Sequence, residues 1–144
     1  MFPPFKPSKP QKPSHPSPSK ASNSSPSSSG QLAEQAAKVH LESQGLQWVN
    51  SNYRCKMGEI DLIMLDGNTL VFVEVRLRKR NHFATALESI TPRKQQKIIK
   101  AAHRFLSQHP HFQHHNCRFD VIGMDYTSNK PCNIEWITSA FDAY

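Results

Sequence analysis

Apolar and polar positions along this chain follow two periods, which divide it into helices and strands. Apolar residues recur at helical spacing over 31–44 and again over 92–108, where Thr91-Pro92 supplies an N-cap followed by proline at the first helical position. Runs rich in apolar and β-branched residues predict strands at 47–53, 59–65, 70–78, 118–124 and 133–138. The predicted order is α-β-β-β-α-β with a short final strand.

A tight turn is expected between the second and third of these strands. Asp66-Gly67-Asn68 separates them, and turns of this composition join antiparallel neighbours. The third strand, 70–78, is apolar on both faces along most of its length, which is typical of a central strand covered by helices. The pattern therefore predicts an α/β fold in which helices flank a mixed sheet.

The first 29 residues differ in composition from the rest of the chain. They contain eight of the eleven prolines, four lysines and no acidic residue. Such a stretch buries too little apolar surface to offset its conformational entropy. We expect 1–29 to be a disordered tail rich in Pro, Ser and Lys, and 30–144 to form one domain. Without the tail's lysines the net charge of +7 falls to about +3, so any basic surface must arise from clustering.

The cysteines and the apolar runs of the sequence indicate the cellular compartment of the protein. The three cysteines, Cys55, Cys117 and Cys132, have no CxxC spacing, which disfavours both a disulfide framework and a cysteine-based zinc site. No apolar run approaches the roughly 18 residues that cross a bilayer, and no apolar core of a signal peptide is present. We therefore expect a soluble, cytoplasmic protein with no membrane partner.

Charged residues interrupt the second and third predicted strands at positions that share a face. Glu59 and Asp61 lie two residues apart, as do Glu74 and Arg76, and side chains two apart on a strand point the same way. Since their neighbours are apolar on both faces, these acids do not belong to an ordinary solvated edge. An acid in such a setting requires a partner or a function.

The turn decides how the two acidic pairs meet. If Gly67-Asn68 are its central residues, Asp61 lies opposite Glu74; if Asp66-Gly67 are central, Glu59 lies opposite Glu74. Both registers place the acids on one side of the sheet.

Two carboxylates at paired positions repel unless a positive charge lies between them. Magnesium commonly binds one or two carboxylates together with water and substrate phosphate oxygens. We therefore predict that Asp61 and Glu74 bind Mg²⁺, with Mn²⁺ as the alternative ion and the Val75 carbonyl as a third ligand. Such an ion would lower the pKa of an attacking water and screen the phosphate in phosphodiester hydrolysis.

Arg76 would stabilise the charge that develops in that reaction. A guanidinium stays protonated and cannot be the base, which leaves metal-bound hydroxide, Glu59 or another carboxylate. A structural role is the alternative: Glu59 would pair with Arg76, and Asp61 would contact backbone amides. That alternative leaves Glu74 without an evident partner.

Basic residues cluster at the end of the third strand and along the second helix. Contact with phosphate groups is the predicted role, and a solvated helix face is the alternative. The residues concerned are Arg78, Lys79, Arg80, Arg93, Lys94 and Lys97. No helix-turn-helix or zinc-finger pattern is present, so base-specific recognition is not expected.

Two further groups of residues are expected to be structural. The histidines after the second helix lack the spacing of a zinc site and are assigned to a surface loop: His109, His111, His114 and His115. The aromatic residues in strand and helix patterns are assigned to the core: Trp48, Phe72, Phe105, Phe119 and Trp136.

Taken in order, several motifs resemble the YraN-type family of uncharacterised bacterial proteins. They are GEIDLI, the turn, LVFVEVR, TPRK at the start of a helix, RFDVIGMD and IEWITSAF. The resemblance runs from about residue 30 to residue 144 and leaves the tail outside. That family is similar in fold to archaeal Holliday-junction resolvases, PD-(D/E)xK nucleases and tRNA-endonuclease-like domains. The resemblance thus implies a restriction-endonuclease-like core.

The resemblance also implies roles for individual residues. Asp61 and Glu74 match the two acids of those nucleases, and Arg76 stands where they usually carry lysine. Glu34 takes the place of a helical glutamate that some resolvases add to the metal site. The implied activity is that of a magnesium-dependent endonuclease acting on structured or branched DNA in preference to RNA, with a homodimer as the assembly. A nucleic-acid-binding module without hydrolysis, which Arg76 would explain, and a protein-interaction domain are the alternatives.

Overall fold

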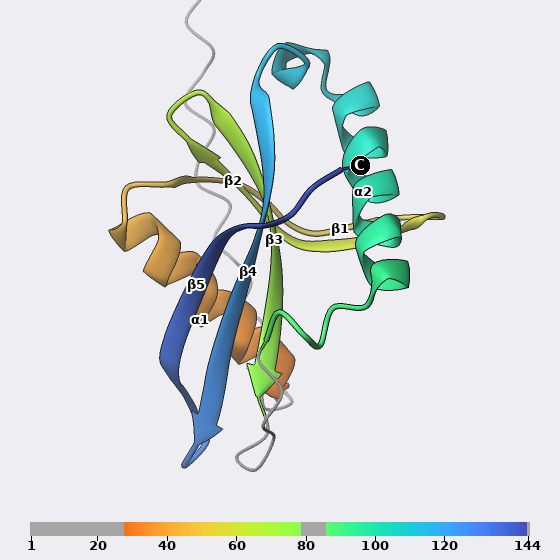
Figure 1. The fold of residues 1–144 in the computed structure, drawn as a ribbon. Coiled ribbons are helices and arrows are strands. Elements are labelled where there is room, and N and C mark those ends of the chain that lie inside the picture. The colour runs from red at the N-terminus through yellow and green to blue at the C-terminus, as the bar shows by residue number, and fades with distance from the viewer. Residues whose placement is uncertain (1–27, 79–85, 144) are drawn as a thin grey trace, which may run out of the picture.

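The computed structural model describes residues 28–78 and 86–143, in which a five-stranded sheet carries one helix on each face (Figure 1). The elements are α1 (Ser29–Ser43), β1 (Gln47–Cys55), β2 (Gly58–Asp66), β3 (Thr69–Arg78), α2 (Pro92–Gln108), the 3-10 turn η1 (Pro110–Phe112), β4 (Asn116–Thr127) and β5 (Lys130–Phe141). The predicted α/β fold is confirmed, and its arrangement is consistent with a restriction-endonuclease-like core.

The strands follow one another across the sheet in the order β1-β2-β3-β4-β5. Among the described strands, β3 and β4 run parallel and the other neighbouring pairs are antiparallel. A parallel pair needs a crossover connection, and α2 lies in the one between β3 and β4. The strand with the most apolar sequence, β3, therefore lies at the centre of the sheet.

Alternation along β3 divides the interior into two cores. Phe72 packs with Phe105 of α2 in one core, and Val73 packs with Leu41 of α1 in the other. Side chains on either side of the strand are fully excluded from solvent, as in a central strand buried on both faces. The sheet is thus held between two helices that do not share a core.

Side-chain caps fix where both helices begin. Ser28 and Gln31 form a reciprocal capping box, so α1 starts two residues before the predicted position. Thr91 accepts a hydrogen bond from the Lys94 backbone N–H, and Pro92 fills the first turn of α2, whose predicted bounds are confirmed. Apart from Ser28 and Ser29, the predicted tail lies outside the described residues.

The prediction of a short final strand was wrong. Both β4 and β5 contain 12 residues and form a long hairpin. Its turn is Ser128-Asn129, where both residues have positive φ, as a two-residue turn of this hand requires. Two register shifts, with positive φ at Asn133 and Ser139, interrupt the alternation of β5. The sequence pattern is broken there although the strand continues.

Trp48 was wrongly assigned to the core, since it is 47% exposed near the start of the edge strand β1. Its indole N–H donates to Ser51 Oγ, and the Lys38 ammonium lies 4.5 Å from the ring centroid. Among the histidines, His111 and His114 are exposed and lie in or beside η1, as the predicted surface connection requires. Within the described ranges, no helix is long and apolar enough to cross a membrane.

A buried carboxylate organises the irregular part of β5. Asp120 of β4 is fully buried and accepts hydrogen bonds from Arg118 Nε at 3.0 Å, Trp136 Nε1 at 2.9 Å and the Ser139 backbone N–H at 3.0 Å. Arg118 also pairs with Asp66 at 3.0 Å. A buried charge is tolerated because it is fully hydrogen-bonded, and here the Ser139 amide that the register shift displaces becomes one of its donors.

Replacing Asp120 by alanine should destabilise the fold by about 3–5 kcal/mol, because Arg118, Trp136 and the Ser139 N–H lose the buried acceptor that they share. Urea unfolding followed by circular dichroism measures this change. Asp142→Ala, at an exposed position beyond β5, is the matched control and should stay within about 0.5 kcal/mol of the wild type. A similarly small change for Asp120→Ala would show that the network does not stabilise β5.

Candidate metal-binding site

The β2–β3 turn selects the first of the two predicted registers. Asp66 pairs with Thr69, so Gly67-Asn68 are the central residues, and Gly67 has a φ of +58°. The pairing continues to Leu62 opposite Val73 and ends there. Asp61 and Glu74 are the next residues along each strand, immediately beyond the last pair.

Where β2 and β3 separate, an aspartate side chain of β2 replaces the backbone as the hydrogen-bond partner of β3. The Val75 N–H donates to Asp61 Oδ2 at 2.8 Å. In a strand, the N–H and C=O of one residue point toward the same neighbouring strand, so the Val75 carbonyl is also directed to the side that β2 has left. The predicted third ligand therefore lies at the edge of the space between the strands.

The alternation of β2 is interrupted at Asp61. Ile60 packs in the α2 core, whereas Leu62 packs in the α1 core, although strict alternation would place both on one face. On β1, Asn52 lies between the partners of these two residues and has a φ of +54°. The local twist brings Asp61 into a space that side chains from both helices reach.

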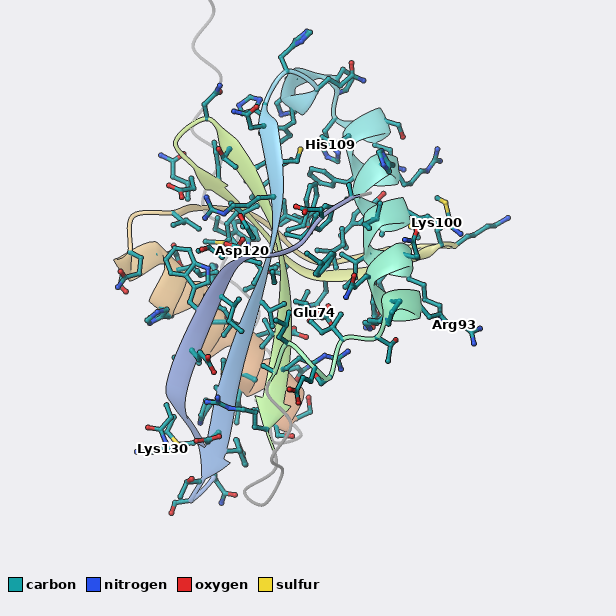
Figure 2. All side chains as sticks on the ribbon, in the orientation of Figure 1. Glu74, Arg93, Lys100, His109, Asp120 and Lys130 are labelled. Atoms are coloured by element: carbon teal, nitrogen blue, oxygen red, sulfur yellow. The ribbon has the colours of Figure 1, made fainter. Side chains whose placement is uncertain are left out.

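That space is a pocket of about 340 Å³, here called the acidic pocket. Gly30 and Ala33 of α1, Val75 and Leu77 of β3, and six charged residues line it. The charged residues are Glu34, Glu59, Asp61, Glu74, Arg76 and Lys94. Every residue predicted to be catalytic or to bind metal is thus at one location. Figure 2 shows Glu74 on the side of the sheet that faces α2.

Glu74 is the most buried charged residue of the pocket, with 4% of its side chain exposed. Arg76 Nη2 and Lys94 Nζ each lie 3.5 Å from its Oε1 oxygen. Both cations remain about a third exposed, at 31% and 30%. The Arg76 Nε is buried without a hydrogen-bond partner in the described residues. The two cations therefore reach from Glu74 toward the open side of the pocket.

Burial raises the pKa of both central carboxyl groups. Burial raises the pKa of Glu74 to about 8, and the negative charge of Asp61 adds to the rise. Burial also raises the pKa of Asp61, which the Val75 amide partly offsets. Glu74 is hydrogen-bonded to Asp61 in a direction that favours the proton on Glu74. With a pKa of about 8, Glu74 keeps its proton near neutral pH.

Glu34 and Glu59 lie at the rim of the acidic pocket. Burial and the charge of Asp61 raise the pKa of Glu34, which Asn52 partly opposes through a hydrogen bond. Glu59 pairs with Arg54 at 3.5 Å, whereas Arg76 pairs with Glu74. The Glu59–Arg76 pair of the structural alternative is therefore not formed, while its contact between Asp61 and a backbone amide is present.

The predicted phosphate-binding residues are not all free to bind. Arg78 is held by Asp125 at 3.1 Å and Glu135 at 2.8 Å. Arg93 and Lys97 are exposed on α2. Lys79 and Arg80 lie outside the described residues.

Lys94 belongs to the acidic pocket, which the sequence interpretation missed. The spacing between Lys94 and Ile98 indicated this position. Lys94 lies one helical turn before Ile98, which is the first residue of the apolar stripe that faces the sheet. A lysine at that position lies on the face of the amphipathic helix that is turned toward the sheet, which brings Lys94 to Glu74.

The donor atoms of the acidic pocket fit a magnesium ion better than a transition metal. In the described part of the chain, no cluster of three or more His, Cys, Asp or Glu side chains could hold a metal on its own. Asp61 and Glu74 supply two adjacent carboxylates, and the Val75 carbonyl is directed to the side of β3 that β2 has left. Two carboxylates completed by water and substrate oxygens are what Mg²⁺ commonly uses.

The mixed sheet, the crossover helix and the paired acids define this chain as an α/β domain whose architecture is consistent with the restriction-endonuclease-like class. The model of the uncharacterised protein family UPF0102 matches residues 33–124. The chain belongs to this family, which is the YraN-type family that its motifs resemble.

Several relatives match over most of their length. A UPF0102 protein of Pseudomonas fluorescens is 47% identical over 115 residues, which cover 80% of this chain and 94% of the relative. One from Alcanivorax borkumensis is 47% identical over 113 residues, covering 78% and 90%. One from Pseudomonas aeruginosa is 46% identical over 115 residues, covering 79% and 92%.

Without a bound ion, the stability of the protein should fall as the pH rises from about 4.5 to about 8. Glu74 binds its proton more tightly in the folded chain than in the unfolded one, where its pKa is 4.5. The stabilisation is therefore complete below 4.5 and is lost as the pH rises through about 8, with a slope of up to about 1.4 kcal/mol per pH unit. Urea unfolding in EDTA at several pH values measures this slope. Glu74→Gln should flatten it, and an unchanged slope would contradict the assignment.

Proposed function

We propose that this protein is a divalent-metal-dependent nuclease that hydrolyses phosphodiester bonds in structured or branched nucleic acid, with DNA preferred to RNA. The observation that supports this most is the arrangement around Glu74: this buried carboxyl group and the half-buried Asp61 share one space, and two partly exposed cations border the Glu74 Oε1 oxygen. A metal cation would bind the carboxylates of this space, and a negatively charged phosphate would bind its two cations.

Asp61, Glu74 and the Val75 carbonyl would hold the ion, and Glu34 would contribute from the rim. When bound, Mg²⁺ lowers the pKa of an attacking water and screens the negative charge of the phosphate. Metal binding in the acidic pocket requires Glu74 to lose its proton, because a carboxylate must be ionised to bind a cation. Lys94 and Arg76 favour that ionised form.

Arg76 and Lys94 would stabilise the charge that grows on the phosphoryl oxygens as the water oxygen attacks phosphorus and the bond to the leaving oxygen breaks. The nucleases that this family resembles usually have lysine where Arg76 stands. Lys94 places an ammonium against the same Glu74 oxygen from a different element. Although Arg76 stands where those nucleases usually have lysine, Lys94 therefore still supplies an ammonium group to the site.

The proton released by the attacking water needs an acceptor, and the leaving oxygen must gain a proton from solvent. Arginine cannot accept one. Glu59 is the most exposed carboxylate of the acidic pocket, with 51% of its side chain in contact with solvent. We assign the acceptor role to Glu59, which can pass the proton on to solvent.

Cleavage should require Mg²⁺ or Mn²⁺ and both central acids. Purified protein should cut at least one substrate from a set of junction, flap and single-stranded nucleic acids. Asp61→Asn and Glu74→Gln should lower the rate at least about a thousandfold, or about 4 kcal/mol of transition-state stabilisation. Lys94→Ala should lower it by about 10²–10³, whereas Lys100→Ala, on the same helix but outside the pocket, should not. Wild-type binding without any cleavage would favour the binding-module alternative.

Magnesium binding should displace the proton that Glu74 holds. The dissociation constant should therefore fall about tenfold per pH unit up to about pH 8 and then level off. Isothermal titration calorimetry in buffers of different ionisation enthalpy counts the released protons. Glu74→Gln should abolish the heat of binding, and Glu42→Gln, an exposed acid of α1, should leave it unchanged. Binding that is independent of pH would show that the ion does not displace this proton.

A further inference from the structure

A second pocket adjoins the acidic pocket and has the opposite charge. It lies between the β1–β2 hairpin and α2, encloses about 360 Å³, and is here called the hairpin pocket. Its charged residues are Arg54, Lys56, Glu59, Lys94 and Lys97. Glu59 and Lys94 also line the acidic pocket, so the two pockets share a wall.

Positive charge in the hairpin pocket is only partly neutralised. Glu59 pairs with Arg54, and Lys94 lies at Glu74. In the part of the chain that the structure describes, no carboxylate is within ion-pair distance of Lys56 or Lys97. Cations held close together without a counter-charge attract a mobile anion.

The hairpin is held tightly against the helix. A Cβ atom on Gly58 would lie 2.8 Å from the Lys97 carbonyl oxygen, closer than real Cβ contacts allow. The two backbones can therefore approach only because position 58 is glycine. This close approach fixes the hairpin residue Lys56 and the helix residue Lys97 around one opening, and the exposed Met57 adds an apolar wall beside them.

We propose that the hairpin pocket binds the phosphate and sugar of the nucleotide next to the cleaved bond. This inference rests on the proposed function, since it assumes that a nucleic-acid strand crosses the acidic pocket. A strand whose scissile phosphate lies near Lys94 continues over the shared wall into the hairpin pocket. Lys56 and Lys97 contact the adjacent phosphate there, and Met57 packs against the sugar or base. The pocket has the size of a small ligand site rather than of an open duplex groove.

The test is the affinity of the full chain for a short fluorescein-labelled single-stranded DNA, measured by anisotropy in EDTA over a range of salt concentrations. Lys56→Ala/Lys97→Ala should weaken binding about five- to twentyfold and lower the salt slope by about one to two. The matched control is Lys100→Ala/Lys130→Ala, which removes the same charge from exposed positions outside the pocket; Figure 2 shows Lys130 at the far tip of the β4–β5 hairpin and Lys100 on the outer side of α2. The control should bind within about twofold of the wild type.

Equal losses in both double variants, or no loss in either, would overturn the hairpin pocket as a local site. Because the assay contains no divalent ion, its result is independent of hydrolysis. Loss of affinity confined to Lys56→Ala/Lys97→Ala supports the subsite even if no substrate is cleaved. Metal-dependent cleavage combined with unchanged binding by that variant overturns the subsite and leaves the proposed function standing.

Discussion

The site depends on one local event, the replacement of a strand partner by a carboxylate. Beyond Leu62 and Val73 the backbones of β2 and β3 no longer pair, and Asp61 accepts the hydrogen bond of the Val75 amide instead. This contact satisfies a backbone donor that the separation of the strands would otherwise leave unpaired. It also holds Asp61 beside Glu74, so the opening of the sheet and the acidic pair have the same origin.

Two carboxylates in a buried space are unfavourable, and the fold limits that cost in two ways. Glu74 keeps its proton near neutral pH, which removes one charge, and Lys94 lowers the pKa of Asp61 and, with Arg76, that of Glu74. Lys94 is held by the α2 cap and by the packing of Ile98 one turn later, so the core beneath α2 positions a charge of the site. Stability and site geometry are therefore linked through the same helix.

Local sequence signals predicted much of this structure. The Gly67-Asn68 turn limited the register to two choices, of which the observed one pairs Asp66 with Thr69, and Thr91-Pro92 marked the start of α2. The interruption of β2 at Asp61 could not be predicted, because it occurs together with a positive φ at Asn52 on the neighbouring strand, which the sequence of β2 does not reveal. For the same reason β5 was predicted too short: its register shifts are stabilised by Asp120, a tertiary partner that periodicity does not reveal.

The two adjoining pockets have consequences for the order of binding under the proposed function. The acidic pocket is lined by four carboxyl groups, of which Glu74 keeps its proton near neutral pH, and by two cations, so a phosphate strand would meet more negative than positive charge there until a divalent ion is bound. The hairpin pocket carries excess positive charge and attracts the strand without an ion. The hairpin pocket would thus bind the strand first. The next phosphate of the strand would enter the acidic pocket only when a divalent ion is bound there. Glu59, on the wall between the pockets, pairs with Arg54 and so weakens the positive side next to the boundary. The charge of Glu59 therefore contributes, with that of Lys94, to the change in electrostatic potential between the hairpin pocket and the acidic pocket.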